Sequence, residues 1–331
     1  MCMEGFYMGK AIDIVALGEV LIDFTEAGAG KDGMKLFEQN PGGAPANLLT
    51  AASHMGYHTA FIGKIGTDMH GAFLKKTLQN EGIETKGLIE DPNYFTTLAF
   101  VAIDENGERN FSFARKPGAD TQLREEDLDK ELLGNCRIFH FGSLSLTDEP
   151  AHSATLAAIQ IAKEAGALIS YDPNYRAPLW TSREAAIEEM KSVIPMVDIM
   201  KISDEESLMI TGAKTYEEAA DHILAQGVKL VALTLGGDGV LMATKEKKKV
   251  VDAFRTDAVD TTGAGDSFWG GFLSRFLAYD KKVEDLTWEE IRTCAVNGNA
   301  VAGLCVQKRG GIPAIPTRGE VEQFLREKEQ A

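Results

Sequence analysis

The fold of this chain is decided by the stretch Asp260-Thr261-Thr262-Gly263-Ala264-Gly265-Asp266-Ser267-Phe268, which runs directly into Trp269-Gly270-Gly271-Phe272-Leu273-Ser274-Arg275-Phe276. The second part has the apolar spacing of an amphipathic helix, and the first part is a glycine loop that leads into its N-terminus. Backbone N–H groups at such a terminus point outward, and the helix dipole adds positive potential. The stretch therefore predicts a site for an anionic group such as a phosphate.

Asp266 falls in the first turn of the predicted helix, beside the anion site. A carboxylate there can orient and deprotonate an attacking hydroxyl, and the amides of Gly263, Ala264 and Gly265 can stabilise charge on a transferring phosphoryl group. The residues alone leave another interpretation open. Asp266 can simply be an acidic residue at a helix start, and the glycines can simply form a tight turn.

Strand-like and helix-like runs alternate along most of the chain. Apolar runs typical of buried strands span residues 12–17, 59–65, 137–141, 167–171, 198–202 and 230–235. Runs with helical spacing span residues 44–55, 69–80, 151–165, 183–197 and 216–226. Thr181 and Glu184 form a candidate capping box for the helix over 183–197. This alternation predicts an α/β fold with three α/β/α layers and a mostly parallel central sheet.

Two stretches, 20–37 and 96–115, read as strands with no helix between them. The second contains the turn pair Asn106-Gly107 between two alternating runs, which is typical of a β-hairpin. We expect a small separate β-sheet that covers a site as a lid, built from strands within about 20–40 and 96–115. The alternative is an antiparallel extension of the main sheet. In either case the chain is expected to form one domain over 1–331.

The composition of the chain disfavours several classes of protein, namely nucleic-acid-binding, membrane-spanning and disulfide-rich proteins. The formal net charge is −16, which disfavours binding to nucleic acid or to anionic membrane surfaces. The four cysteines, at positions 2, 136, 294 and 305, form no CxxC pair and fit reduced thiols. There is no apolar run of about 18 residues, and residues 1–10 do not resemble a signal peptide. We therefore expect a soluble, cytoplasmic protein.

Two further segments are candidates for binding a polyol. In the segment 40–47 a proline follows two glycines near a helix start, so Gly42 and Gly43 can expose backbone amides while Asn47 both donates and accepts. The segment can also be only a loop and a helix start. Asp23 lies inside an apolar run and needs a ligand or an ion-pair partner. Sugar hydroxyls are suitable ligands, and a structural salt bridge is the alternative.

Other candidate residues follow predicted strands. The segment 234–239 leaves a buried strand, where ligands bind in open α/β sheets, although a hairpin turn explains its glycines almost as well. Arg176 leaves another predicted strand, and Arg115 ends the predicted hairpin. Both arginines are candidates for substrate recognition, and each alone is weak evidence because surface arginines are common.

Together these motifs resemble the ribokinase-like (PfkB) carbohydrate kinase family over nearly the whole chain. Gly42-Gly43 with Asn47 resembles its N-terminal signature, and 260–266 resembles its highly specific C-terminal signature. The segments 41–47, 172–180 and 201–206 look most like those of fructokinases. The resemblance implies a ribokinase-like fold with a small β lid, ATP as co-substrate, Mg²⁺, and transfer to a primary hydroxyl, namely the 6-hydroxyl for D-fructose.

The resemblance also implies roles for individual positions. Asp266 matches the general base, and Gly263, Ala264 and Gly265 match the anion hole. The matching sugar or substrate contacts are Asp23, Gly42, Gly43, Asn47, Arg115 and Arg176. The matching nucleotide-side positions are Thr234, Gly236, Gly239 and Asn299. The matching cation positions are Glu206 for Mg²⁺ through water, and Asp260 with Thr262 for K⁺.

Some positions depart from the family pattern. Ser203 stands where many relatives have Asn, which weakens the placement of Mg²⁺ only slightly because fructokinases often carry Ser there. Ala314 stands where ribokinases have a serine ligand, which weakens the expectation of a K⁺ requirement. A 2-keto-3-deoxygluconate kinase is the main alternative, since two arginines could bind its carboxylate, although Phe113 near the site favours a neutral sugar. A non-catalytic sugar- or nucleotide-binding regulator is the alternative of another class. The lid strands have edges that could pair between subunits, so a homodimer is a further hypothesis.

Overall fold

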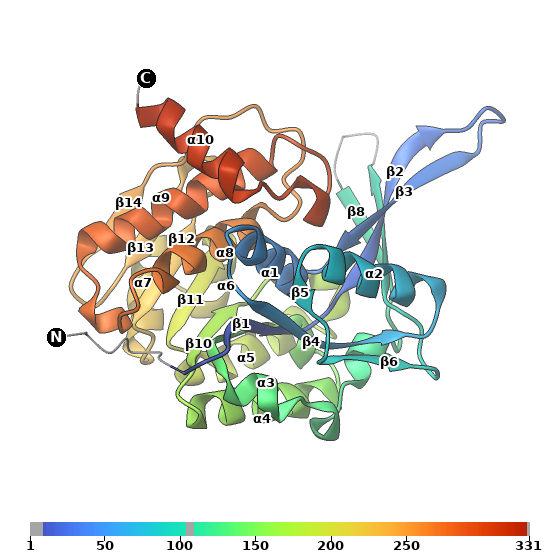
Figure 1. Ribbon diagram of the computed structural model, residues 1–331, viewed down its shortest axis with the longest axis horizontal. Coiled ribbons are helices and arrows are strands. Elements are labelled where there is room, and N and C mark those ends of the chain that lie inside the picture. Colours follow the sequence, from blue (N-terminus) through green and yellow to red (C-terminus); the bar gives the residue numbers. More distant parts are fainter. Residues whose placement is uncertain (1–8, 104–108, 330–331) are drawn as a thin grey trace.

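The computed structural model describes residues 9–103 and 109–329, and within these ranges the strands form two separate sheets (Figure 1). The large sheet contains β1 (Ile12–Leu17), β4 (Thr59–Gly66), β5 (Ile83–Glu84), β6 (Leu88–Asp91), β9 (Cys136–Gly142), β10 (Leu168–Asp172), β11 (Ile199–Ser203), β12 (Leu230–Thr234), β13 (Val240–Ala243) and β14 (Lys248–Val251). The small sheet contains β2 (Leu21–Ala29), β3 (Lys35–Gly42), β7 (Leu98–Ile103) and β8 (Arg109–Ala114).

The large sheet is mostly parallel, as the alternating pattern predicted. Its strands follow the order β14-β13-β12-β11-β10-β9-β1-β4-β5, and β6 also pairs with β4. All pairings from β12 across to β5 are parallel, whereas β12, β13 and β14 form an antiparallel edge. The carboxyl ends of the parallel strands therefore meet along one edge of the sheet, which is where an open α/β sheet binds its ligands.

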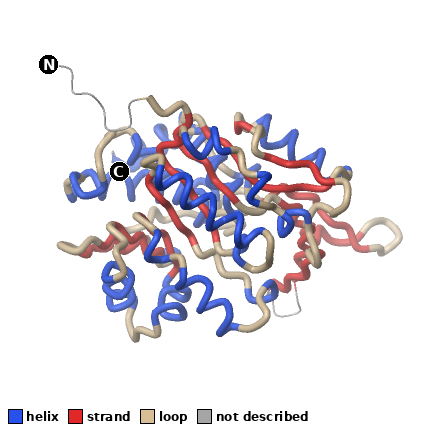
Figure 2. The backbone as a smooth tube through the Cα atoms, turned by 90° about the horizontal axis from the view of Figure 1, so that it is seen from below, coloured by secondary structure: helices blue, strands red, loops and turns tan. Residues whose placement is uncertain are grey.

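Helices cover both faces of this sheet (Figure 2). They are α1 (Ala44–His54), α2 (Met69–Asn80), α3 (Lys130–Gly134), α4 (Ala151–Glu164), α5 (Arg183–Ser192), α6 (Asp204–Thr211), α7 (Tyr216–Ala225), α8 (Ala264–Leu277), α9 (Trp288–Cys305) and α10 (Arg318–Glu329). Helices α3 to α7 pack on one face, and α1, α2, α8 and α9 pack on the other. The predicted three-layer α/β/α arrangement is confirmed.

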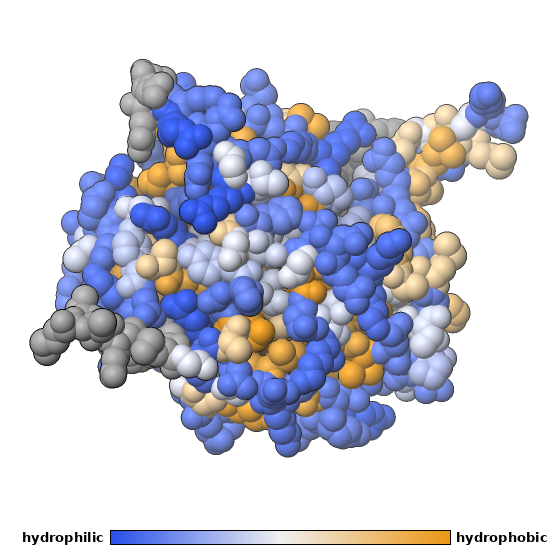
Figure 3. Space-filling view, in the orientation of Figure 1, coloured by the Kyte–Doolittle hydropathy of each residue, from blue (hydrophilic) through white to orange (hydrophobic). Residues whose placement is uncertain are grey.

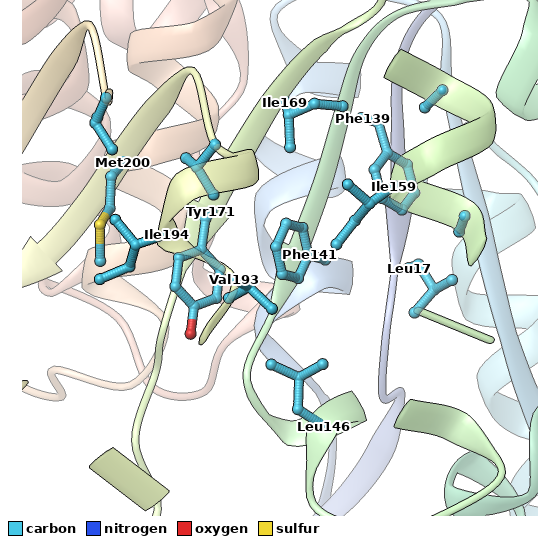
Figure 4. Packing of buried hydrophobic residues seen from close by; sticks show 14 of the residues in the cluster. Leu17, Phe139, Phe141, Leu146, Ile159, Ile169, Tyr171, Val193, Ile194 and Met200 are labelled. Carbon is cyan, nitrogen blue, oxygen red and sulfur yellow. The ribbon is translucent and has the colours of Figure 1, made fainter. Parts of the chain in front are cut away.

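Each face of the sheet has its own apolar core because neighbouring side chains on a strand point to opposite faces. On β1, Val15 and Leu17 belong to one core, and Ile14 belongs to the other. The first core contains an aromatic stack in which the ring centroids of Phe141 and Tyr171 lie 4.7 Å apart (Figure 4). The parallel strands are thus buried on both faces, which is why they read as continuous apolar runs in the sequence.

The small sheet has the order β3-β2-β7-β8 and does not extend the main sheet. Its members are the strands expected within 20–40 and 96–115, so the prediction of a separate sheet is confirmed and the alternative of an extension is wrong. The strands β7 and β8 pair antiparallel as a hairpin. The predicted turn at Asn106-Gly107 lies outside the described residues. Figure 1 shows the hairpin of β2 and β3 projecting from the body of the molecule.

The sequence-based boundaries differ from the structure at one helix in particular. The helix expected over 183–197 ends at Ser192, because Pro195 lies in the short 3₁₀ turn Ile194–Met196 that follows. The predicted capping box at Thr181 is also wrong by one residue. Ser182 is the N-cap, and its hydroxyl accepts a hydrogen bond from the backbone N–H of Ala185. No helix within the described ranges is both long enough and apolar enough to cross a membrane.

A buried hydrogen-bond chain fixes helix α8 to the middle of the sheet. The indole N–H of Trp269 donates to the hydroxyl of Ser170 on β10 at 2.9 Å, and the same hydroxyl lies 2.9 Å from Nδ1 of His140 on β9. Burial lowers the pKa of His140 to about 3, so the imidazole is neutral. This contact joins the start of α8 to the strand whose carboxyl end leads into the 172–176 segment.

We expect Trp269→Phe to lower the free energy of unfolding by about 1–3 kcal/mol, because it removes a buried hydrogen bond and leaves a small void. Urea denaturation of the purified variant measures the change. In a Ser170→Ala background the same substitution should cost about 1 kcal/mol less, because the hydrogen bond is already absent. Equal costs in the two backgrounds would show that the indole N–H contributes nothing.

Candidate active site

A cavity of about 480 Å³ lies between the small sheet and the edge of the large sheet. The small sheet contributes Asp23, Thr25, Asn40, Val101 and Phe113 to its walls. The glycine loop and the start of α8 contribute residues 260–266. The small sheet also contributes Leu21, the first residue of β2. The other lining residues come from the junctions around β1, α1 and the ends of the central strands: Glu19, Gly43, Ala44, Asn47, Leu144, Asn174, Arg176, Lys201, Ser203, Glu206 and Gly310.

The glycine loop turns sharply to begin helix α8. Gly263 is the N-cap with φ of 74°, a left-handed conformation that favours glycine, and the N–H of Ala264 donates to the carbonyl of Thr261. Among residues 9–103 and 109–329, no side chain caps this helix end. The first turn of α8 therefore presents backbone N–H groups and the positive end of the helix dipole to the cavity, as the sequence predicted for an anion site.

Asp266 lies in that first turn and is buried, with 8% of its surface exposed. Its two carboxylate oxygens accept hydrogen bonds from two different amides. Asn47 on α1 donates to Oδ2 at 2.8 Å, and Asn174 in the loop after β10 donates to Oδ1 at 2.9 Å. Each oxygen keeps further lone pairs, so the fixed carboxylate can still accept a proton from a hydroxyl in the cavity.

The glycines of the N-terminal element are explained by close approaches. A Cβ on Gly42 would lie 2.3 Å from Oδ2 of Asp23, and one on Gly43 would lie 2.5 Å from the backbone oxygen of Glu19. Gly43 also has φ of 116°, a backbone conformation that residues with a side chain rarely adopt. The absence of these two side chains lets β3 and the start of α1 pack against the Asp23 carboxylate and the end of β1.

The Asp23 carboxylate lines the cavity and is not part of a salt bridge within the described ranges. Arg176 and the carboxylates of Asp260 and Asp266 are its charged neighbours. Burial raises the pKa of Asp23 to about 6, with Arg176 opposing this change and the two carboxylates adding to it. The structure therefore favours a polar ligand over the alternative of a salt bridge.

Glu19 is a second desolvated carboxylate in the same wall. Only 4% of its surface is exposed, and its Oε1 accepts a hydrogen bond from the backbone N–H of Ala44 at 3.0 Å. Burial raises the pKa of Glu19 to about 7, against the lowering effect of backbone hydrogen bonds and of Arg115. This side chain thus fastens the start of α1 to the end of β1 at the edge of the cavity.

The two arginines proposed for substrate recognition behave differently. Arg176 is exposed and lines the cavity, with Nη1 donating to the carbonyl of Tyr175. Arg115 is buried and does not line the cavity. Its guanidinium donates to Asp120, to the hydroxyl of Thr147 and to the carbonyl of Leu144 at 2.7–2.8 Å. Arg115 thus joins the end of β8 to the main body of the protein.

The four positions expected on the nucleotide side do not line this cavity. Thr234 ends β12, and Gly236 lies in the connection to the antiparallel strand β13. The backbone of this segment therefore forms a hairpin turn, which was the alternative explanation for its glycines. A Cβ on Gly239 would lie 2.2 Å from the carbonyl oxygen of Val251. Asn299 on α9 donates to the same carbonyl at 3.3 Å and to that of Asp252 at 2.9 Å. These contacts shape the edge of the sheet beside the cavity.

The residues proposed to hold cations are engaged with the backbone. Both oxygens of Glu206 accept backbone N–H groups, from Tyr175 at 2.7 Å and from Ser203 at 3.0 Å, in a capping box at the start of α6. Asp260 accepts the backbone and hydroxyl hydrogens of Thr262 through Oδ1, and the N–H of Gly310 through Oδ2. In the part of the chain that the structure describes, no group of three or more acidic, histidine or cysteine side chains could by itself hold a metal.

The polar residues of the cavity that the sequence reasoning missed as site residues include Glu19, Asn174 and Lys201. Asn174 has φ of 49°, and asparagine is among the few residues that adopt this conformation readily, so its place after the predicted strand was a usable signal. Glu19 and Lys201 are single charged residues in or beside apolar strands, which require partners when buried.

We expect protein stability to fall as the pH rises from about 4.5 to about 7, because Glu19 binds its proton more tightly in the folded state than in the unfolded state. Glu19→Gln, which cannot ionise, should be more stable than the wild type at pH 8 by up to about 3 kcal/mol and equally stable near pH 4.5. Urea denaturation at both pH values measures this difference.

Glu320→Gln is a control for which the expected change in stability at pH 8 has the opposite sign. Hydrogen bonds from the backbone of Thr317 and the side chain of Lys308 lower the pKa of Glu320 to about 2, so its charge stabilises the folded state at pH 8. That variant should be less stable than the wild type at pH 8. A Glu19→Gln variant that is also less stable at pH 8 would contradict the prediction.

Comparison with known proteins agrees with this geometry. The family model described as pfkB family carbohydrate kinase matches residues 11–318. Probable fructokinase-4 of Arabidopsis thaliana is 42% identical over 321 residues, covering 96% of this chain and 98% of that protein. A fructokinase structure from Xylella fastidiosa with bound ATP superposes with a TM-score of 0.88 at 31% identity, covering 96% of this chain and 99% of that one.

A double mutant of the fructokinase from Vibrio cholerae O395, bound to fructose, ADP and potassium ion, gives a TM-score of 0.85 at 30% identity, with 96% of this chain and 99% of that chain covered. The resemblance that the two signatures indicated is therefore confirmed, and so is the ribokinase-like fold. This chain belongs to the pfkB family of carbohydrate kinases.

Proposed function

We propose that this chain is an ATP-dependent fructokinase, which transfers the terminal phosphoryl group of ATP to the 6-hydroxyl of D-fructose. The observation that carries the proposal is Asp266, a buried carboxylate held by two amides at the N-terminal turn of α8 and facing the cavity. The names of the relatives point the same way, since one is a fructokinase with bound ATP and another holds fructose and ADP.

The arrangement supports an in-line transfer. A sugar hydroxyl placed beside Asp266 gives its proton to the carboxylate as its oxygen attacks the terminal phosphorus of ATP. The amides of Asn47 and Asn174 keep the carboxylate aimed throughout. The N–H groups at residues 263–265 stabilise the charge that develops on the phosphoryl oxygens. Asp23 and the backbone at Gly42 and Gly43 are proposed to bind the remaining sugar hydroxyls.

The nucleotide is proposed to lie along the outer side of the glycine loop, towards the β12–β13 turn. Thr234, Gly236 and Gly239 form this turn, and Asn299 supports the strand beyond it. Because Asn299 already donates to two carbonyl groups, its proposed contribution is to hold this wall in place for the adenosine part of ATP. The sheet edge brings the turn to the same side as the cavity, as the proposal requires.

Two cations are proposed to act with ATP. Glu206 lines the cavity with both oxygens already accepting backbone hydrogens, which suits a contact to Mg²⁺ through water while the phosphates supply direct ligands. Asp260 and Thr262 are proposed to hold K⁺ beside the loop, where its charge would reinforce the anion site. The buried Ala314 supplies no side-chain oxygen to such a site, so a weak dependence on K⁺ is expected.

The contacts of Arg115 favour a neutral sugar over a sugar acid. A 2-keto-3-deoxygluconate kinase was the alternative because Arg115 and Arg176 could both bind a carboxylate. The Arg115 guanidinium instead pairs with the buried Asp120 at 2.7 Å and lies outside the cavity lining. That leaves the exposed Arg176 as the remaining candidate for a carboxylate, whereas Asp23 and Glu19 in the wall would repel one when they are ionised.

The experiment that tests the proposal is a coupled ADP-release assay with Mg·ATP and K⁺. It compares D-fructose with 2-keto-3-deoxygluconate, ribose and glucose. The highest kcat/KM for fructose supports the fructokinase assignment, and the highest value for the keto-deoxy acid replaces the substrate while keeping the mechanism. No ADP release with any sugar, at protein concentrations that still bind ATP, would favour the non-catalytic regulator.

The small sheet is proposed to act as a lid over the cavity and as a dimer interface. Met34, Leu36 and Phe37 on and beside β3 are 67%, 50% and 40% exposed, which is unusual for such large apolar side chains. Figure 3 shows apolar residues along the projecting hairpin behind a hydrophilic tip. The edge strand β3 also offers unpaired backbone groups to a second copy of the chain.

We expect sedimentation equilibrium to show a dimer for the wild type and a monomer for Leu36→Lys, because a charge on this edge opposes burial in an interface. Met69→Lys is the matched control. Met69 is 75% exposed on α2, outside the small sheet, so its substitution should leave the dimer intact. A wild-type monomer at micromolar concentration would remove the dimer hypothesis.

We expect Asp266→Asn and Asp266→Ala to lower kcat for the preferred sugar by about 10²–10⁴-fold, because the general base is lost. The Asn variant turns an amide N–H₂ toward one of the two amide donors, so Ala tests the same loss without that clash. Thermal unfolding should show that both variants remain folded. A folded variant with kcat within threefold of the wild type would exclude Asp266 as the base.

A further inference from the structure

Lys201 is a buried cation in the wall of the catalytic cavity that the proposed mechanism has not used. It lies on β11, and 7% of its side chain is exposed. Its ammonium group is 2.8 Å from Oδ2 of Asp172, at the end of the neighbouring strand β10. A lysine ammonium has three N–H donors, and within the described ranges this is the one hydrogen bond from Lys201 to another side chain.

The ammonium lies directly against the anion site. A Cβ built on Gly265 would be 2.8 Å from Nζ of Lys201 and 3.3 Å from its Cε. Gly265 is in the first turn of α8, beside Asp266, so the lysine ammonium lies close to the backbone of that turn. A positive charge is thus held at the same helix end that presents its N–H groups to an anion.

The charges of the side chains that line the cavity indicate a role for the Lys201 ammonium. Five carboxylate side chains line it: Glu19, Asp23, Glu206, Asp260 and Asp266. Within the described part of the chain two cationic side chains line it, and Arg176 is exposed while Lys201 is buried. A donor with several negative charges must enter this field. A buried cation acts more strongly than an exposed one because solvent screens it less.

The lysine remains charged in this environment. Burial alone would lower the pKa of Lys201, but the carboxylates of Asp172, Glu206 and Asp266 outweigh it and raise the pKa above its usual value. The pair with Asp172 also fixes the position of the ammonium. Stability alone does not explain this pair, because two buried charges stabilise the folded state little more than a well-packed apolar pair does.

Resting on the proposed function, we propose that Lys201 is a catalytic residue whose ammonium contacts the terminal phosphoryl group of ATP during transfer, and that Asp172 is its positioning residue. The phosphorus–oxygen bond to ADP breaks while the bond to the sugar oxygen forms, and the sugar proton goes to Asp266. Lys201 keeps its proton throughout and stabilises negative charge on the non-bridging oxygens together with the N–H groups of the glycine loop.

The test removes the pair without leaving a lone buried charge. In Lys201→Met/Asp172→Asn both partners are neutral and similar in size. The matched control is Lys64→Met/Asp127→Asn, which removes a second buried lysine, 5% exposed, together with its partner at an N–O distance of 2.6 Å, outside the cavity. Asp91, which lies 3.5 Å from the same ammonium, is partly exposed and keeps its hydrogen bonds from Asn93. Thermal unfolding of both double variants reports what each pair contributes to stability.

We expect the Lys201 double variant to lose at least about 10²-fold in kcat, with a smaller change in KM for the sugar, while the Lys64 double variant stays within threefold of the wild type. Isothermal titration supplies a second readout that needs no sugar. The ratio of the Kd for β,γ-methylene ATP to the Kd for ADP should rise by about tenfold or more in the Lys201 variant only, because only the analogue carries the terminal phosphate.

A folded Lys201 double variant with kcat within threefold of the wild type, or with an unchanged nucleotide ratio, would overturn the proposal. If that variant does not fold, a crystal structure of the wild type with ADP, Mg²⁺, aluminium fluoride and fructose decides. Nζ of Lys201 within about 3.2 Å of a fluoride supports the contact, and a distance beyond about 4.5 Å refutes it. If the wild type binds nucleotide but does not phosphorylate fructose, the sugar assignment is wrong. The ratio of the Kd for β,γ-methylene ATP to the Kd for ADP still tests the proposed role of Lys201 in that case.

Discussion

The arrangement of the candidate active site depends on one buried carboxylate, Asp266, and on the two amides that hold it. Asn47 comes from the start of α1, and Asn174 comes from the loop after β10, so three distant segments of the chain converge on one side chain. A buried carboxylate is costly unless its oxygens accept hydrogen bonds, and here each oxygen has its own donor. The layers of the fold satisfy this requirement. Helix α1 and helix α8 pack side by side on one face of the sheet, and the hydrogen bond from Trp269 to Ser170 ties α8 to β10, whose end leads to Asn174.

The second constraint is the negative charge of the cavity itself. Burial raises the pKa values of Glu19 and Asp23 to about 7 and about 6, so the wall formed by these two residues carries less charge near neutral pH than its composition suggests. Elsewhere in the cavity the helix end of α8 and the ammonium of Lys201 supply positive potential. A net acidic protein can thus bind an anionic donor, because the field is set locally by desolvated groups rather than by the overall charge of −16.

The sequence predicted the elements whose signal is local and failed where partners lie far apart in the chain. The strand from Ile12 to Leu17 and the helix from Met69 to Asn80 were predicted at their observed bounds, since apolar runs and helical spacing are properties of a few neighbouring residues. The antiparallel edge of β13 and β14 was missed because each strand has only four residues and β14 begins with two lysines. Arg115 was assigned to the substrate, yet its partners Asp120, Thr147 and Leu144 come together only in the folded chain. For the same reason nothing in the local pattern could show that Asn174 would meet Asp266.

The glycines show how such distant partners are brought together. A side chain on Gly42 would strike the carboxylate of Asp23, and one on Gly265 would strike the ammonium of Lys201. Each glycine therefore marks a place where the backbone must approach a charged side chain from another segment. Read from the sequence, the same glycines indicated only a loop that approaches a phosphate or a polyol. In the folded chain these glycines lie against the charged side chains of Asp23 and Lys201, and the positions of such side chains must be fixed before a site can recognise a ligand.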